Sequence, residues 1–372
     1  MDRSQKATGE QMRVALLSYG FGEYCVRFAS ALAREAQVLL VLPDDLLKAY
    51  VSLLDNTVEV YTFQKPRLRQ PLRQLLAIHA IIRRIREFRP DVLHLQQGHL
   101  WFNIALPLVR RYPLVVTIKD PRVHLGDRDS ARTPQLMWDI AYRRADQIIV
   151  HADALRHTVV AELRIPSDRV HVISLIALGD PEAAIGCEEE DLVLFFGRIW
   201  PYKGLEYLIR AEPLIAEQVP GVRIIIAGRG EDLTRYKRLM VHPERFVIHN
   251  EYVSDERRAD LFRRASIVVL PYVEATQTGV IPLAYTFAKP VVATRVGGLP
   301  EMVDHGSTGY VVPPRDEGAL ADAIVRLLRD TELRRRLGQN AKHKVHTQLA
   351  ADVTARQTLA VYDRAIQDHA ER

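Results

Sequence analysis

Residues 192–205 read LVLFFGRIWPYKGL, and this stretch sets a pattern that recurs along the chain. Leu192–Phe196 is an uninterrupted apolar run of strand length, which predicts a strand buried on both faces. Gly197–Gly204 then carries the glycines and the proline of a loop, and a helical pattern begins near Gly204. A strand, a loop and a helix in this order form the repeating unit of α/β domains.

The same unit recurs on both sides of this stretch. Each further apolar run is short and continuous, and helical patterns lie between the runs, which predicts parallel strands covered by helices. The expected strands before it are Arg13–Ser18, Val38–Leu42, Val58–Phe63, Asp91–Leu95, Leu114–Ile118, Gln147–Val150 and Val170–Ile173, and those after it are Arg223–Ala227, Phe246–His249, Ile267–Leu270 and Val291–Thr294.

The length and the linker pattern predict two domains. The chain has 372 residues, and a single core stops growing beyond about 250–300 residues. Gly179–Asp191 is acidic and rich in turn residues, as linkers are. We therefore expect an α/β fold with two doubly wound, Rossmann-like domains, residues 1–180 and 190–345, that face each other across a cleft. Residues 346–372 should hold a C-terminal helix that crosses back to the first domain.

Composition excludes several classes of protein. The chain is 48% hydrophobic and 26% charged, which is globular composition, and it has no apolar run long enough for a spanning helix. Met1–Lys6 leads into polar residues, which argues against secretion. Cys25 and Cys187 are the two cysteines, too few for a disulfide framework or a zinc ribbon. We expect a cytoplasmic protein.

The positive charge is concentrated in residues 64–89. The chain carries a formal charge of +5, and this segment alone holds eight bases against the single acid Glu87. Its apolar residues have near-helical spacing, so we expect them to face the core and the bases to form the opposite rim. The rim could be a solvated helix face, or it could contact the anionic inner face of the membrane. Nucleic acid fits less well, because no aromatic residues interleave with the bases. The apolar residues are Leu75, Leu76, Ile78, Ile82, Ile85 and Phe88.

Two loops of the second domain carry candidate binding residues. In the first, Arg198 and Lys203 present two cations beside a helix start, which suits a diphosphate. In the second, Glu274 would accept from hydroxyl groups, and the backbone before Pro282 would offer N–H donors. The plain alternatives are a solvated surface turn and a capped helix with a surface glutamate. The residues expected to offer these backbone N–H groups are Gln277, Thr278, Gly279 and Val280.

As an ordered set, the motifs of the second domain resemble glycosyltransferase family 4, which has the GT-B fold and retains anomeric configuration. The likeness is dense over residues 190–340 and thinner over 1–180. The carrying motifs are Gly197-Arg198…Lys203-Gly204, Ala227-Gly228-Arg229-Gly230, Glu274…Gly279, Lys289–Thr294, Val296–Glu301 and Thr308–Pro314, with Asp91–His94 and Ala145–His151 in the first domain.

The resemblance implies roles for individual residues. The donor diphosphate would lie against Arg198 and Lys203, and Glu274 would be the first glutamate of a Glu-x7-Glu motif that faces the donor sugar. The second glutamate falls on Pro282 or Leu283, neither of which can bind ribose through its side chain. The chain thus resembles a subgroup of the family that lacks this glutamate.

A loop of the first domain supplies further candidates. Related enzymes have His-Asp-Pro-x-x-His-x-Gly where this chain keeps Asp120, His124 and Gly126 but has Lys119 in place of the first histidine. The resemblance implies that Asp120 and His124 are catalytic together with Glu274. A packing histidine is the plain alternative for His124. Gly20 and Gly22 would let the backbone approach a substrate, unless they form only a tight turn.

The functional expectation is a metal-independent, retaining hexosyltransferase without a cofactor. It would use a UDP or GDP sugar and a glycan, lipid-linked or small-molecule acceptor, for example in polysaccharide biosynthesis. The alternatives are a nucleotide-sugar 2-epimerase, a non-catalytic nucleotide- or glycan-binding protein, and an NAD-dependent oxidoreductase. The last is disfavoured because Gly20-Phe21-Gly22 lacks the third glycine of a dinucleotide fingerprint. Asp127 and Asp129 form a D-x-D tripeptide, the metal motif of another transferase fold, but no matching pattern surrounds them.

Overall fold

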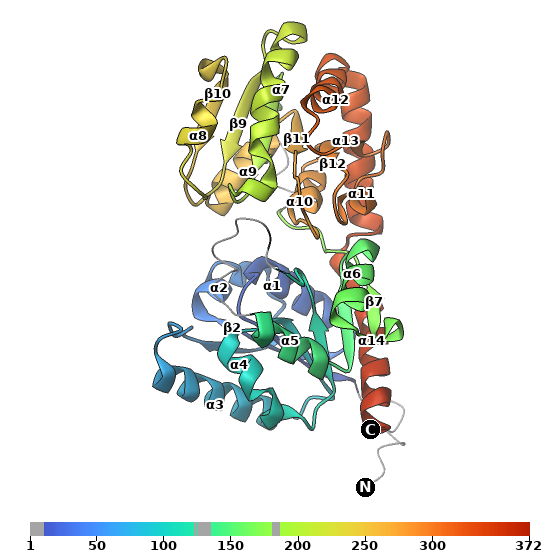
Figure 1. Ribbon diagram of the computed structural model, residues 1–372. Helices are drawn as coiled ribbons and strands as arrows, with labels where there is room; N and C mark the ends of the chain where they lie inside the picture. The colour runs from blue at the N-terminus through green and yellow to red at the C-terminus, as the bar shows by residue number, and fades with distance from the viewer. Residues whose placement is uncertain (1–10, 123, 125–134, 181–186) are drawn as a thin grey trace.

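The computed structural model describes residues 11–122, 124, 135–180 and 187–372, and these form two lobes that each contain a parallel sheet (Figure 1). The strands of the first sheet lie in the order β3-β2-β1-β4-β5-β6-β7. They are β1 (Arg13–Ser18), β2 (Gln37–Pro43), β3 (Glu59–Phe63), β4 (Val92–Gln97), β5 (Leu114–Thr117), β6 (Gln147–Val150) and β7 (Val170–Val172). The helices of this lobe are α1 (Gly22–Leu32), α2 (Asp44–Lys48), α3 (Pro71–Phe88), α4 (Leu100–Ala105), α5 (Gln135–Arg144) and α6 (Asp153–Leu163).

The second lobe repeats this design. Its strands lie in the order β10-β9-β8-β11-β12-β13 and are β8 (Leu192–Phe196), β9 (Arg223–Ala227), β10 (Phe246–His249), β11 (Ile267–Leu270), β12 (Val291–Thr294) and β13 (Gly309–Val312). Its helices are α7 (Leu205–Gln218), α8 (Thr234–Lys237), α9 (Asp255–Arg264), α10 (Val280–Thr286), α11 (Leu299–Met302), α12 (Glu317–Arg329) and α13 (Thr331–Thr347). The expectation of two doubly wound α/β domains is confirmed.

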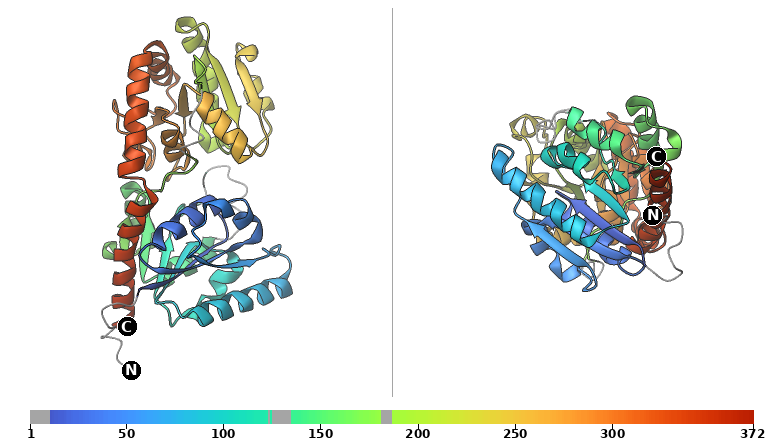
Figure 2. Two further views of the ribbon diagram at one scale, coloured as in Figure 1. Left: turned by 180° about the vertical axis from the view of Figure 1, so that it is seen from behind. Right: turned by 90° about the horizontal axis from the view of Figure 1, so that it is seen from below.

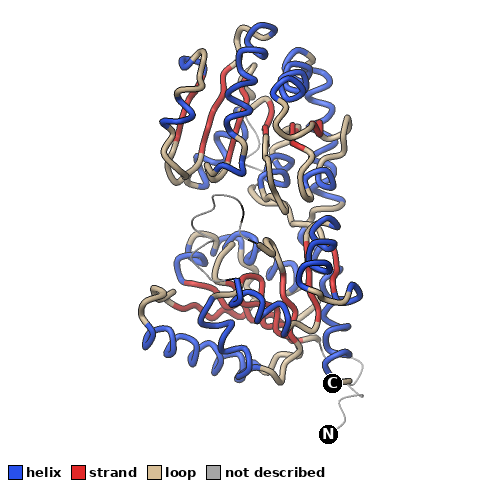
Figure 3. The backbone as a smooth tube through the Cα atoms, in the orientation of Figure 1, coloured by secondary structure: helices blue, strands red, loops and turns tan. Residues whose placement is uncertain are grey.

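Helices cover both faces of each sheet (Figure 3). Alternate residues of one strand accordingly enter different cores: Ala15 and Leu17 pack on one side of the first sheet, and Val14 and Leu16 pack on the other. Because both faces of the sheets are buried, the side chains on both sides of a strand are apolar. The strands therefore appear in the sequence as continuous apolar runs. No helix of the described residues is both long and apolar enough to cross a bilayer.

The last helix, α14 (Ala351–Ala370), leaves the second lobe and packs against the first (Figure 2). The Tyr362 hydroxyl lies 2.6 Å from Nδ1 of His94 on β4, and the other ring nitrogen of His94 lies 2.8 Å from the Thr117 hydroxyl. Where the chain passes between the lobes, the Ala177 N–H donates to the Leu349 carbonyl at 2.8 Å. The two crossing segments therefore lie side by side.

Helix α3 corrects one expectation. Ile78, Ile82, Ile85 and Phe88 are buried as expected, but Leu75 and Leu76 are 55% and 70% exposed. The buried face of α3 recurs at three- and four-residue intervals and begins in the first turn, at Gln74. Leu75 and Leu76 follow Gln74 directly, so they point away from this face. The buried residues of α3 are Gln74, Ile78, Ile81, Ile82, Ile85 and Phe88.

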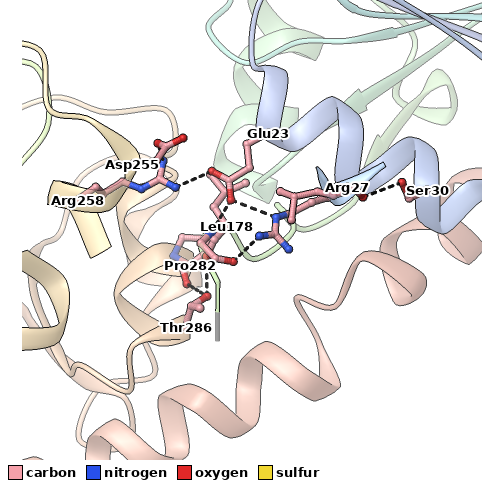
Figure 4. Close-up of polar contacts among 10 residues, drawn as sticks. Glu23, Arg27, Ser30, Leu178, Asp255, Arg258, Pro282 and Thr286 are labelled. Carbon is pink, nitrogen blue, oxygen red and sulfur yellow. Dashed lines mark hydrogen bonds and ion pairs between the residues drawn. The ribbon is translucent and has the colours of Figure 1, made fainter. Parts of the chain in front are cut away.

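A buried carboxylate on α1 joins the two lobes (Figure 4). Glu23 is 6% exposed and accepts hydrogen bonds from the Gly179 N–H at 2.6 Å and from Arg27 at 3.1 Å. Its other oxygen accepts from Arg258 on α9 of the second lobe at 2.9 Å. Arg27 also donates to the Gly179 carbonyl at 2.6 Å. One side chain thus binds the first lobe, the crossing segment and the second lobe together.

A second contact between the lobes joins a carboxylate to the start of helix α6. Both carboxylate oxygens of Glu301 on α11 accept backbone N–H groups at the start of α6, from Asp153 at 2.6 Å and Ala154 at 2.8 Å. A negative charge at a helix start is favourable, because the first N–H groups of a helix lack intrahelical partners. Close by, a Cβ at Gly298 would stand 2.4 Å from the Cβ of Ala152, so glycine permits this approach.

We expect Glu23→Gln to loosen the two lobes. The change leaves Arg27 and Arg258 without the charge that they share, and breaking a buried ion pair costs about 3–5 kcal/mol. Denaturant unfolding should show a loss near the lower end of this range, since glutamine keeps some hydrogen bonds, and small-angle X-ray scattering should show a larger radius of gyration. The control is Glu251→Gln, whose exposed pair with Arg257 is worth less than about 1 kcal/mol. Equal effects of the two substitutions would contradict this role of Glu23.

Candidate functional site

Loops at the carboxyl ends of both sheets meet between the lobes. In each sheet the strand order reverses at one point, between β1 and β4 in the first and between β8 and β11 in the second. Ligands of doubly wound domains bind in the crevice at such switch points. The loops after β5, β8 and β11 supply the residues described next.

A histidine of the first lobe is held between one carboxylate from each lobe. Nδ1 of His124 lies 2.8 Å from Oε1 of Glu274, and Nε2 lies 3.0 Å from Oδ1 of Asp120. The imidazole is buried, while the Asp120 and Glu274 side chains are 41% and 48% exposed. Thr276 of the second lobe donates its hydroxyl hydrogen to Asp120. The structure therefore brings together the three residues expected to be catalytic.

The two carboxylates favour the imidazolium form of His124. Burial disfavours the charged ring, but the hydrogen bonds and negative charges of Asp120 and Glu274 outweigh it and raise the pKa of His124 above its ordinary value. In this form both ring nitrogens donate. For Asp120, burial acts in the opposite sense to its hydrogen bonds with His124 and Thr276, which prevail and lower its pKa. The ionised form of Asp120 and the cationic form of His124 thus favour each other.

The position of Glu274 depends on the loop after β8. The Tyr202 carbonyl accepts the N–H groups of Val273 at 2.9 Å and of Glu274 at 3.4 Å. Gly204 allows the close approach: its φ is +62°, and a Cβ there would lie 2.0 Å from the Pro271 carbonyl oxygen. The two candidate loops of the second lobe are therefore one packed unit.

Two cations lie beside the histidine, around Tyr202. The Tyr202 ring stacks on the His124 ring with 4.8 Å between centroids. Arg198 donates to the Tyr202 hydroxyl at 3.1 Å, and the Lys203 ammonium lies 3.7 Å from the centre of the Tyr272 ring. Lys203 is buried and Arg198 is exposed. The Tyr202 side chain thus contacts both His124, which carries the two carboxylates, and Arg198 of the loop after β8.

The segment before α10 differs in part from the expectation. Thr278 is buried, and its hydroxyl accepts the Val280 N–H at 3.2 Å, so this backbone donor already has a partner. Gln277 is half-buried, and its buried Oε1 accepts no hydrogen bond from the residues described. Gly279 immediately precedes α10. Pro282 and Leu283, where the second glutamate of the family motif would fall, are buried.

The two glycines after β1 have different neighbours. A Cβ at Gly20 would meet Oε1 of Gln97 at 1.9 Å, a flexible side-chain end. A Cβ at Gly22 would meet the Leu46 carbonyl oxygen at 2.8 Å and the ring of Tyr50, so Gly22 serves the packing of α1 on α2. Gly126, Asp127 and Asp129 lie outside the described residues, as do residues 1–10 and 181–186.

Sequence reasoning missed Tyr202 and Thr276. Both stand inside the quoted loops, but their partners are distant in the chain: Thr276 bonds a residue 156 positions away. Only Tyr202 could have been singled out from the sequence, because an aromatic residue between Arg198 and Lys203 can contact both cations with its ring. Nothing in the local sequence marks Thr276.

Comparison with known proteins gives consistent matches. A model described as Glycosyltransferase Family 4 matches residues 19–175, and one described as Glycosyl transferases group 1 matches residues 190–330. An uncharacterized glycosyltransferase of Methanocaldococcus jannaschii is 30% identical over 302 residues, 74% of this chain and 76% of the relative. The D-inositol 3-phosphate glycosyltransferase of Kribbella flavida is 31% identical over 315 residues, 74% of this chain and 71% of the relative.

A solved structure shares the fold. Anabaena HepE in complex with UDP-glucose superposes with a TM-score of 0.69 at 19% identity, covering 94% of this chain and 100% of the other.

The charge of His124 can be measured by NMR titration of its ring. We expect a pKa above the ordinary value in the wild type, and a lower one in Glu274→Gln and in Asp120→Asn, because each substitution removes one of the two charges that oppose burial. A raised pKa means that the contact through His124 is strongest at low pH and weakens as the pH rises through that pKa. Glu251→Gln, which removes an exposed carboxylate on another loop, is the control. A wild-type pKa below the ordinary value would refute the imidazolium assignment.

Proposed function

The chain belongs to glycosyltransferase family 4, with the GT-B fold, and from this premise we propose that it is a retaining hexosyltransferase that uses a nucleotide diphosphate sugar. The donor is a UDP or GDP hexose, and the acceptor is a glycan, a lipid-linked molecule or a small molecule. UDP-glucose is the first donor to test, since a solved protein of the same fold was crystallised with it.

One observation carries the proposal: residues of both lobes converge on His124. Asp120 comes from the first lobe and Glu274 from the second, and the Tyr202 ring links them to Arg198 and Lys203. In the proposed complex the donor bridges the lobes, with its diphosphate on the second lobe. The hexose then lies at His124 and Glu274, whose hydrogen-bonding atoms suit sugar hydroxyls.

Arg198 and Lys203 would act on the leaving group. Cleavage of the sugar–phosphate bond leaves negative charge on the nucleotide diphosphate, and cations fixed in advance stabilise such charge without reorganisation. Arginine binds phosphate through a planar fork and lysine as a point charge. Because these two residues supply the positive charge, we propose that the reaction needs no divalent cation.

The exposed start of α3 supports a second element of the proposal, association with an anionic membrane. Leu72, Leu75 and Leu76 are 75%, 55% and 70% exposed and follow the spacing of one helix face. Exposed apolar residues beside bases are typical of surfaces that insert into the headgroup region. The neighbouring bases are Arg67, Arg69 and Arg73, all exposed.

The bases at the other end of α3 are engaged within the protein. Arg84 pairs with Glu59 and Glu87, and Arg86 donates to the Leu108 carbonyl at 3.0 Å. The proposed membrane contact is therefore the first half of α3 with the residues before it, rather than the whole basic segment.

For the donor site, we expect Arg198→Ala and Lys203→Ala to lower turnover of UDP-glucose by roughly tenfold to a hundredfold each. This is the net contribution of about 1.5–3 kcal/mol from a charge-assisted phosphate contact. Formation of UDP is the readout, and Arg329→Ala, an exposed arginine on α12, is the control. Activity should persist in EDTA. Wild-type rates in both variants would refute the donor site.

Product analysis in the same assay distinguishes the alternatives. A transferase forms an α-linked glycoside from an α-linked donor if it retains configuration, whereas an epimerase releases free sugar even when acceptor is present. A binding protein would form no UDP at all.

For the membrane, we expect the double variant Leu72→Ser/Leu76→Ser to bind anionic vesicles at least about tenfold more weakly. Burying one leucine contributes about 1.5–3 kcal/mol, and the two side chains need only be partly inserted to reach this loss. Co-sedimentation with phosphatidylglycerol vesicles is the measurement. Leu214→Ser/Val241→Ser removes two exposed apolar residues of the other lobe and is the control. If both double variants bound the vesicles equally well, the start of α3 would be a solvated surface and not a membrane contact.

A further inference from the structure

A groove lies beside β7, the last strand of the first sheet, and α6 and α14 form its walls (Figure 1). Its volume is about 670 Å³, within the range of roughly 300–1,000 Å³ that is usual for small-ligand sites. No residue that lines it belongs to the site around His124. The groove is therefore a separate place on the first lobe where a small molecule could bind.

Two arginines line this groove, one from each helix. Arg364 of α14 is exposed and makes no hydrogen bond or ion pair with the described residues. Arg156 of α6 is half-buried, and its two contacts are long, 3.7 Å to Asp153 and 3.4 Å to the Ser167 carbonyl. Asp153 also contacts His157 at 3.0 Å, so it keeps a partner if Arg156 turns to another anion. Both guanidinium groups are thus available to a ligand.

The positive charges of both arginines act on one histidine of β7. Burial lowers the pKa of His171, and the charges of Arg364 and Arg156 lower it further. Two carboxylates, Asp168 and Asp368, act in the opposite sense. Because each arginine acts more strongly than either carboxylate, the net charge around this ring is positive. An anion is therefore attracted to this part of the groove.

Apolar side chains complete the lining of the groove. Val172 of β7 is 42% exposed, whereas Val170 and Ile173 are buried. Ala360 of α14 also lines the groove and is exposed. A ligand that covered Val172 and Ala360 would remove apolar surface from water, which is favourable. The groove therefore suits a molecule that has an organic part as well as an anionic group.

We propose that this groove is an effector site for a phosphate monoester, whose phosphate is held by Arg156 and Arg364 and whose organic group packs on Val172. A phosphate monoester carries about two negative charges at neutral pH, which match the two guanidinium charges, whereas a carboxylate would match only one. The planar fork of arginine also binds phosphate oxygens in pairs. The inference does not depend on the proposed transferase function, because the groove shares no residue with the donor site.

An occupant of this groove acts on the docking of the lobes. The Asp153 N–H belongs to the wall of the groove and donates to Glu301 of the second lobe at 2.6 Å. Helix α14 is the segment that returns from the second lobe to the first. A phosphate held by Arg156 and Arg364 joins α6 to α14 across the groove. It therefore favours the docked lobes, on which the site around His124 depends.

The test is calorimetry with phenyl phosphate, inorganic phosphate and phenol, with UDP present throughout to occupy the proposed donor site. We expect phenyl phosphate to bind more tightly than the other two, and to bind at least about tenfold more weakly to Arg156→Gln and to Arg364→Gln than to the wild type. Val172→Ser should bring its affinity toward that of inorganic phosphate. The control is Arg356→Gln, which changes an exposed arginine of α14 outside the groove.

The ring of His171 reports where the phosphate binds. A phosphate at Arg156 and Arg364 offsets the charges that lower the pKa of His171, so NMR titration should show a higher pKa when phenyl phosphate saturates the protein. A pKa that does not move at saturation, or wild-type affinity in both arginine variants, overturns the site. Neither result bears on UDP binding, so failure of this site is distinguishable from failure of the donor site.

The link to lobe docking has its own test. Coupling between two equilibria is reciprocal, so a substitution that loosens the lobes should also weaken the ligand. Glu23→Gln, whose contacts lie outside the groove, should weaken phenyl phosphate binding at least about fivefold, and Glu251→Gln should leave it unchanged. Equal affinity of the Glu23 variant and the wild type overturns the effector role.

Discussion

The hydrogen bonds of His124 to a carboxylate of each lobe are the interaction on which the site depends. Asp120 and Glu274 lie in loops that follow strands of different sheets, and they are 154 residues apart in the chain. They can hold one imidazole only if the lobes are docked, and buried contacts elsewhere dock them: Glu23 with Arg258, and Glu301 with the start of α6. Lobe docking is thus a precondition for the proposed chemistry.

Charge is arranged around this histidine in a way that fits a donor held by its diphosphate. The carboxylates of Asp120 and Glu274 lie at the two ring nitrogens of His124, and Arg198 and Lys203 lie beside the histidine on the second lobe. In the proposed complex these two cations hold the diphosphate. The sugar then lies at His124, where the carboxylates and the ring provide hydrogen-bond acceptors and donors.

Local patterns in the sequence predicted the sheets well and the contacts between lobes poorly. The bounds of β1, β6, β8, β9, β10, β11 and β12 agree with the apolar runs, because strands buried on both faces show no alternation. Arg198, Lys203 and Glu274 were singled out because loops after such strands reach the crevice, whereas Asp120 and His124 were singled out through the family resemblance. Glu23 and Glu301 gave no signal, since their partners are 235 and 148 residues away. Leu75 and Leu76 were misplaced because a polar residue, Gln74, occupies the buried position in the first turn of α3, so apolar spacing alone assigned the wrong residues to the buried face.

A crystal structure with UDP-glucose tests the central claim most directly. The account predicts the diphosphate within hydrogen-bonding distance of Arg198 and Lys203, and the glucose between His124 and Glu274 at the junction of the two lobes. A nucleotide bound away from the loop after β8, or a glucose that touches only one lobe, would contradict it.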